Sequence, residues 1–209
     1  MAPNEYTLHK HIEKHVSMIH PQGGLEATRL REVLNLDKVR STFNFVEEQL
    51  VGSSVIDLGG ASGFLASYLL LRDKIDSARV IDVDPSLISS GRVFSEKLGI
   101  SDRLSCELGN ICNPRSGSAD TVLSIDSIWG GVRCHPSHGV VDHLSSRVLE
   151  NARNLAEKRL IIRRGFVRPF PEFEPIVRED LKLAGFNVVS LNLEVISHIC
   201  AYNIVAEPI

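Results

Sequence analysis

From Ser53 onward the chain repeats one pattern: a short run of β-branched and apolar residues, then a turn, then a segment with helical spacing. Strands that alternate with helices in this way form parallel βαβ units, because each helix carries the chain back to the start of the next strand. Two later runs, Asn187 to Ile196 and His198 to Glu207, have almost nothing between them, which is typical of a hairpin.

The predicted fold is therefore α/β: a seven-stranded, mostly parallel Rossmann-like sheet with helices on both faces and a C-terminal antiparallel hairpin. The five strands expected before the hairpin are Ser54 to Leu58, Ala78 to Val83, Leu104 to Leu108, Thr121 to Ile125 and Leu160 to Arg163. The helices between them are expected to begin near Gly63, near Ser86, beyond Ser137 and near Pro175.

Two helical segments are predicted ahead of the sheet, from about Thr7 to Ile19 and from about Leu25 to Leu50, the second broken near Asn35 to Asp37. We expect residues 1–40 to form an N-terminal helical cap. The chain has 209 residues, 43% of them hydrophobic, so one domain spanning residues 1–209 can bury a core without disulfide or metal support.

The composition of the chain limits the classes of partner that we expect. A formal net charge of -3 offers no electrostatic attraction for a polyanion, so a small-molecule partner is favoured and nucleic acid is not. The four cysteines show no C-x-x-C pairing, which predicts reduced thiols. The first residues lack the apolar stretch of a signal peptide, and no run reaches the roughly 18 apolar residues of a membrane span. We expect a cytoplasmic protein with no membrane partner.

A glycine-rich turn follows the first predicted strand, where residues 55–63 read VIDLGGASG. Glycine has no Cβ and tolerates positive φ, so a ligand can approach such a turn closely. The turn lies at the carboxyl end of the strand, where open α/β sheets bind ligands. The second strand ends in Asp82-Val83-Asp84-Pro85, which places Asp84 25 residues after Gly59, as a carboxylate that accepts both ribose hydroxyls requires.

These residues resemble the class I S-adenosylmethionine-dependent methyltransferase family, whose first motif is D/E-x-G-x-G-x-G and whose second strand ends in a ribose-binding acid. Here residues 57–63 read DLGGASG, with Ala61 at the middle glycine. The resemblance continues at Gly109-Asn110-Ile111, where the family usually has Gly-Asp and an apolar residue that lines the adenine pocket. The Asn110 amide oxygen can still accept the adenine amino hydrogen. The similarity spans about Val51 to Pro208.

The resemblance implies S-adenosylmethionine as the cofactor, with Asp84 the better placed of the two acids for the ribose. It also implies a helical lid over the pocket, formed by residues 1–40. The cofactor-binding residues that it implies are Asp57, Gly59, Gly60, Ala61, Gly63, Asp82, Asp84, Pro85, Gly109, Asn110, Ile111 and Asp126.

In this fold, the loop after the fourth strand faces the reacting methyl group. Trp129 is expected to form an apolar wall there, and His135 or His138 to act as a general base. A solvated loop with Trp129 in the core is the alternative. Acceptor-binding candidates are Tyr6 and His20 in the lid, and Arg164 at the end of the fifth strand, for which a surface salt bridge is the alternative.

No metal site is expected. Cys134, His135, His138, Asp142 and His143 include metal-ligating types, but their spacing matches no standard zinc pattern. His11 and His15 lie at i and i+4 on one helical face and could form a site, but we interpret them as part of a solvated helix face.

The resulting hypothesis is an enzyme: an S-adenosylmethionine-dependent methyltransferase that acts on a small-molecule acceptor. Sulfonium methyl transfer is an in-line displacement, so the protein mainly positions the acceptor and excludes water. Two alternatives stay open: transfer or cyclisation of the donor's aminocarboxypropyl arm, and a noncatalytic subunit with this fold. The apolar face of the first helix also leaves a homo-oligomer open.

Overall fold

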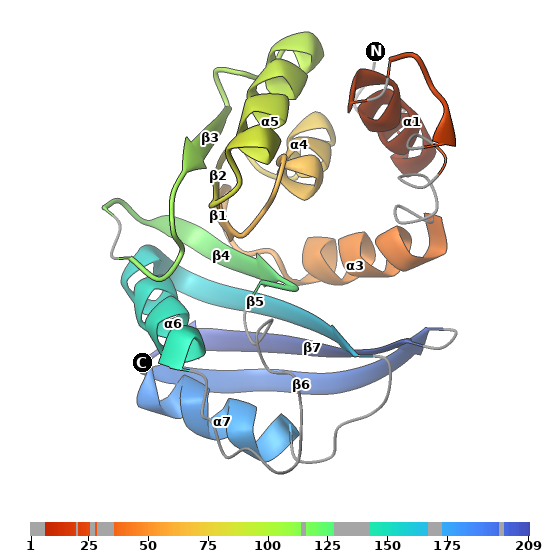
Figure 1. Ribbon diagram of the computed structural model, residues 1–209. Helices are drawn as coiled ribbons and strands as arrows, with labels where there is room; N and C mark the ends of the chain where they lie inside the picture. The colour runs from red at the N-terminus through yellow and green to blue at the C-terminus, as the bar shows by residue number, and fades with distance from the viewer. Residues whose placement is uncertain are drawn as a thin grey trace.

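The protein is described by a computed structural model. The residues that it describes are 7–19, 21–25, 28, 36–113, 116–127, 143–166, 173–196 and 199–209. They contain one sheet of seven strands in the order β3-β2-β1-β4-β5-β7-β6 (Figure 1). The strands are β1 Ser54–Leu58, β2 Ser77–Asp82, β3 Leu104–Leu108, β4 Ala119–Ile125, β5 Ala156–Phe166, β6 Phe186–Ile196 and β7 Ile199–Pro208.

The first five strands run parallel to one another, and β7 pairs antiparallel with both β5 and β6. The predicted mostly parallel sheet with a C-terminal antiparallel hairpin is confirmed. The strand order reverses between β1 and β4, which lie side by side at the centre of the sheet. Ligands of open α/β sheets bind at such a switch point, beyond the carboxyl ends of the strands.

Helices cover both faces of the sheet (Figure 1). One apolar cluster joins the sheet to α1, α3, α4 and α5, and a second joins its other face to α6 and α7. The helices are α1 Leu8–Ile19, α3 Leu36–Gln49, α4 Phe64–Leu71, α5 Pro85–Leu98, α6 His143–Leu155 and α7 Phe173–Leu183. Because α4 and α5 follow β1 and β2 directly, their first turns lie at the carboxyl edge of the sheet, and that of α4 lies beside the switch point.

Strand β5 is longer than the sequence predicted, beginning at Ala156 instead of Leu160 and ending at Phe166 instead of Arg163. The additional length contains charged residues that a hydrophobic pattern excludes. Arg159 pairs with Glu207 of β7 at 2.6 Å, so a partner across the sheet compensates for the polar side chain. None of the helices described in the structure combines the length and apolar character needed to cross a bilayer.

Candidate functional site

The turn between β1 and α4 has an unusual backbone. Gly59 and Gly63 adopt positive φ values of 76° and 70°, and Ala61, a residue with a Cβ, adopts 52°. The turn is tied to the next strand, because the Gly59 N–H donates to the carbonyl of Ile81 at 2.8 Å. A non-glycine residue at positive φ stores strain, and such strain clusters at ligand sites.

Packing requires glycine at two positions of this turn, Gly59 and Gly60, and Gly59 also needs its positive φ. A Cβ on Gly59 would lie 2.4 Å from Cβ of Ser127, and a Cβ on Gly60 would lie 2.5 Å from Cγ of Asp57. The backbone therefore lies directly against the carboxylate of Asp57 and the end of β4. Ser127 was not predicted from the sequence, since a serine after a strand carries no distinguishing pattern.

Asp57 is a buried carboxylate beneath the turn, with 2% of its surface exposed. Its Oδ1 has no hydrogen-bond partner among the described residues. Burial, together with the charge of Asp82, raises the pKa of Asp57 to about 7. A buried polar atom without a partner is uncommon in a folded protein and has a desolvation cost, so this carboxylate is suited to a cationic or hydrogen-bonding ligand.

The two acids at the end of β2 have different surroundings. Asp82 accepts hydrogen bonds from the N–H groups of Ala61 and Asp84, both at 2.9 Å, so it fastens the glycine turn to β2. Asp84 is the N-cap of α5 and accepts from Ser86 N and Leu87 N through Oδ1. Bonds from Ser86 and Leu87 hold the pKa of Asp84 below its ordinary value. No described residue bonds to Oδ2 of Asp84, which is left for a ligand.

The third strand contributes its end to the same edge. Gly109 N donates to the carbonyl of Asp82 at 2.8 Å, which brings residues 109–111 beside the end of β2. The amide oxygen of Asn110 accepts from Cys112 N at 2.9 Å, so it is oriented by its own loop. Ile111 is partly buried and packs against the apolar cluster beneath α6 and α7. Gly59, Asp84 and Asn110 thus follow three adjacent strands.

The ends of β4 and β5 are joined by Asp126, which has a positive φ of 57°. Its Oδ1 accepts from Gly165 N at 2.8 Å and lies 3.6 Å from Nη1 of Arg164. Next to it, the Ser127 hydroxyl donates to the carbonyl of Leu58 in β1. Asp126 and Arg164 therefore lie together at the carboxyl ends of β4 and β5. The cofactor-binding role of Asp126 and the acceptor-binding role of Arg164 stay predictions.

Five other predicted site residues lie outside the described part of the chain: Tyr6, His20, Trp129, His135 and His138. Their proposed roles in the lid and in catalysis remain predictions. The described residues contain no group of three or more histidine, cysteine or acidic side chains placed to hold a metal ion.

The histidines of α1 correct the sequence interpretation. His11 is fully buried and His15 is 4% exposed, so they do not belong to a solvated helix face. They share an apolar stripe with Leu8, Ile12 and Val16, all of which are buried. These positions recur at helical spacing, which was the available signal. Because histidine is polar, the two histidines were not assigned to this apolar stripe from the sequence.

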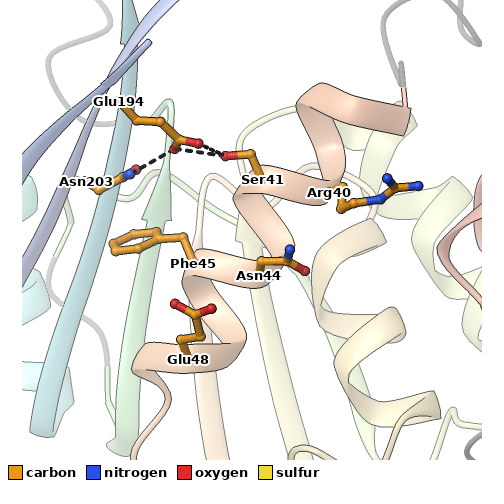
Figure 2. A pocket seen from close by; sticks show the side chains of 7 residues that line it. All are labelled: Arg40, Ser41, Asn44, Phe45, Glu48, Glu194 and Asn203. Carbon is orange, nitrogen blue, oxygen red and sulfur yellow. Dashed lines mark hydrogen bonds between the residues drawn. The ribbon is translucent and has the colours of Figure 1, made fainter. Parts of the chain in front are cut away.

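A second polar region lies between α3 and the C-terminal hairpin (Figure 2). It contains a cavity of about 500 Å³ lined by Ser41, Glu194 and Asn203. The buried Arg163 guanidinium donates to Glu194 at 3.0 Å, to Asn203 at 2.6 Å and to Ser41 at 2.9 Å. Burial raises the pKa of Glu194, but bonds from Ser41, Asn203 and Arg163 outweigh it and bring the pKa below its ordinary value.

Two curated relatives resemble part of the sequence. The ribosomal protein L11 methyltransferase of Edwardsiella ictaluri is 34% identical over 117 residues, which cover 52% of this chain and 38% of that protein. The enzyme of the same name from Escherichia coli is 39% identical over 77 residues, covering 36% of this chain and 25% of that protein. The chain thus matches well under half the length of either relative. No model of a known protein family matches the sequence.

Solved structures match much more of the chain. Magnesium protoporphyrin IX methyltransferase from Synechocystis PCC 6803, with bound SAM, has a TM-score of 0.64 at 19% identity, over 90% of this chain and 86% of its own. The chain has the class I S-adenosylmethionine-dependent methyltransferase fold. A tRNA methyltransferase of B. subtilis matches the same methyltransferase fold with a TM-score of 0.60 at 19% identity, over 79% of this chain and 64% of its own. The family resemblance stated from the sequence is confirmed, and the expected cofactor agrees with the one bound in the Synechocystis structure.

The prediction about partners is wrong. It restricted them to a small-molecule acceptor and excluded nucleic acid, whereas proteins matching this methyltransferase fold are named for a ribosomal protein and for tRNA. The inference used a net charge of -3 for the whole chain. A total charge does not describe the local surface on which a macromolecule binds.

Proposed function

We propose that this chain is an S-adenosylmethionine-dependent methyltransferase with a macromolecular acceptor, and that this acceptor is a protein side chain. The observation that carries the cofactor assignment is the Gly59–Gly63 turn, in which three residues have positive φ and Gly60 lies against the buried carboxylate of Asp57. The Oδ1 atom of that carboxylate has no hydrogen-bond partner among the described residues. A preorganised polar site with unused hydrogen-bonding capacity is what a cofactor needs. The residues therefore fit the cofactor of the fold.

Each strand end supplies one part of the proposed cofactor site. The free Oδ2 of Asp84 would accept hydrogen bonds from the ribose hydroxyls, while Asp82 keeps the turn in place through Ala61. Asn110 would face the adenine amino group. Asp57 would stabilise the positively charged part of the cofactor through the turn.

When bound, S-adenosylmethionine supplies an electrophilic methyl group on a sulfonium. The chain's own contribution is to align the acceptor and to exclude water. The switch point favours an approach over β4 and β5, where Ser127 connects the glycine turn to Asp126 and Arg164. Arg164 would orient the acceptor group beside the donor, and Asp126, expected from the family resemblance to bind the cofactor, would lie between the two.

The proposal for the acceptor follows the sequence relatives, which are more similar than the structural neighbours. Both are named for ribosomal protein L11, at 34% and 39% identity over part of the chain, whereas the tRNA methyltransferase is 19% identical.

The test is to incubate the chain and radiolabelled S-adenosylmethionine with one acceptor at a time: purified ribosomal protein L11, ribosomes or tRNA. The sulfur product of each reaction is identified by mass. S-adenosylhomocysteine together with label in protein supports the proposal. Label in tRNA would overturn the protein acceptor but not methyl transfer. Methylthioadenosine would indicate transfer of the aminocarboxypropyl arm, and absence of donor binding would indicate a noncatalytic subunit.

A further inference from the structure

Helix α1 contacts the Gly59–Gly63 turn and the start of α4 through two histidines. The ring of His11 stacks on Phe64 with 4.5 Å between centroids, and its Nε2 donates to the Phe64 carbonyl at 2.8 Å. Four residues later, Nε2 of His15 lies 3.3 Å from the hydroxyl of Ser62. Ser62 and Phe64 flank Gly63, so α1 contacts the turn on both sides of its last glycine.

We propose that His11 and His15 are positioning residues that hold the Gly59–Gly63 turn in its cofactor-binding shape, and that protonation of the pair releases α1 from the turn. This inference rests on the proposed function, because it assigns the turn to cofactor binding. It adds a pH-dependent control that the fold itself does not require.

The site favours neutral histidines for a physical reason. Burial lowers the pKa of His11 to about 3, against an opposing effect of the Phe64 carbonyl and with a contribution from His15 and Lys14. Burial lowers the pKa of His15 to about 4. The Nδ1 atom of His15 has no partner in the part of the chain that the structure describes, so a proton there would be buried without an acceptor.

Aromatic rings from two helices pack against the pair. From α4 the neighbours are Phe64 and Tyr68, the latter with its ring centroid 5.4 Å from that of His11. From α5 the neighbour is Phe94, at 5.4 Å from His11 and 4.8 Å from His15. The charges of His15 and Lys14 add to the effect of burial in lowering the pKa of His11, and burial lowers the pKa of His15.

The direction of the pH effect follows from these surroundings. Both pKa values are lower with α1 docked than the 6.5 of a free histidine, so the docked helix is fully favoured above about pH 6.5. As the pH falls from 6.5 toward 4, docking weakens by about tenfold per histidine for each pH unit. Cofactor affinity should fall over the same range.

The experiment compares the full chain with the double variant His11→Gln/His15→Gln, in which the amides can still donate but do not titrate. His9→Gln, at an exposed position of the same helix, is the matched control. S-adenosylhomocysteine binding is measured by calorimetry from pH 8 to pH 5.5, and amide hydrogen exchange of residues 8–19 and 59–70 is measured over the same range.

We expect the affinity of the wild type and of His9→Gln to fall at least tenfold more between pH 7 and pH 5.5 than that of the double variant. Protection from exchange, taken relative to the intrinsic rate at each pH, should fall in both segments in parallel, in the wild type and His9→Gln alone. Titration of Asp57 affects all three proteins equally. Identical pH profiles in the wild type and the double variant would overturn the proposal, as would unchanged protection of residues 8–19.

Two further outcomes are separable. If circular dichroism shows that the double variant does not fold, His15→Gln alone should remove about half of the additional pH slope, and an unchanged slope would overturn the proposal. If S-adenosylhomocysteine binds at no pH, the proposed function fails, and the exchange data alone decide whether protonation releases α1.

Discussion

Asp57 and Arg163 are both buried charged residues, on strands β1 and β5 of the same sheet, with 2% and 5% of their surface exposed. Arg163 donates to three polar partners, Ser41, Glu194 and Asn203. The Oδ1 atom of Asp57 has no partner among the described residues, and its carboxyl pKa is raised to about 7. One region therefore satisfies its buried charge internally, and the other does not.

The difference separates a structural polar cluster from a ligand site. In a buried cluster each polar group needs a partner, because a missing hydrogen bond is not replaced by water. A ligand site keeps hydrogen-bonding capacity and backbone strain available until the ligand arrives. The glycine turn that lies against Asp57 contains such strain, since Ala61 has a positive φ. We expect substitutions in the two regions to have opposite effects on stability.

The largest effect is expected at Arg163. Arg163→Met removes the charge that compensates Glu194 and leaves Asn203 without its donor, so the free energy of unfolding should fall by about 3–5 kcal/mol. Urea denaturation measures it. Arg163→Lys keeps the charge but loses the forked geometry and should lose less. Cofactor affinity of the folded variants should be unchanged. If Arg163→Met is as stable as the wild type, the Arg163 cluster does not stabilise the fold.

Asp57→Asn should instead raise the free energy of unfolding. The folded-state pKa of Asp57 is raised above 3.8, so the wild type loses stability as the pH rises from 3.8 toward 7. The asparagine does not ionise, so at pH 8 the free energy of unfolding of the variant should exceed that of the wild type by about 2–4 kcal/mol. The difference should vanish near pH 4. Chemical denaturation at the two pH values tests this. A destabilised variant at pH 8 would show that an unseen partner satisfies the carboxylate.

Asp84→Ala should affect binding more than folding. Loss of the proposed ribose contacts is expected to weaken S-adenosylhomocysteine binding by about one to two orders of magnitude. The variant also loses the N-cap of α5, so Asp84→Ser, which keeps a capping oxygen, is the control. If both variants bind as the wild type does, Asp84 is only a helix cap.

Arg164→Ala is expected to have the smallest effect on stability, no more than about 1 kcal/mol, because its partner Asp126 is mostly exposed. In the ribosomal protein L11 assay the same variant should raise KM for the acceptor and leave donor affinity unchanged. Thermal unfolding together with steady-state kinetics would check both parts. An unchanged KM would leave Arg164 as a surface ion pair.

Local sequence pattern was sufficient for the sheet, because strand runs and glycine turns are encoded within a few residues. It was insufficient for interactions between distant segments. The partners of Arg163 come from α3, β6 and β7, and no spacing rule connects them. The role of Ser127 beneath Gly59 is of the same kind.

The first helix shows the same limit. Leu8, Ile12 and Val16 of α1 belong to the apolar cluster that also contains Val55 of β1. We therefore expect deletion of residues 1–20 to destabilise the whole cluster. Amphipathic spacing showed that the helix must dock, but not that its docking surface includes the cofactor turn.

The most direct test of the assignment is the proton balance of donor binding. S-adenosylmethionine carries positive charge, and a cation beside Asp57 favours the ionised carboxylate. Calorimetric titration at pH 6.5 in two buffers with different ionisation enthalpies should show micromolar binding with release of up to one proton in the wild type, and less release in Asp57→Asn. Absence of binding at millimolar donor, or equal proton release in the two proteins, would contradict the assignment of the Gly59–Gly63 turn and Asp57 as the cofactor site.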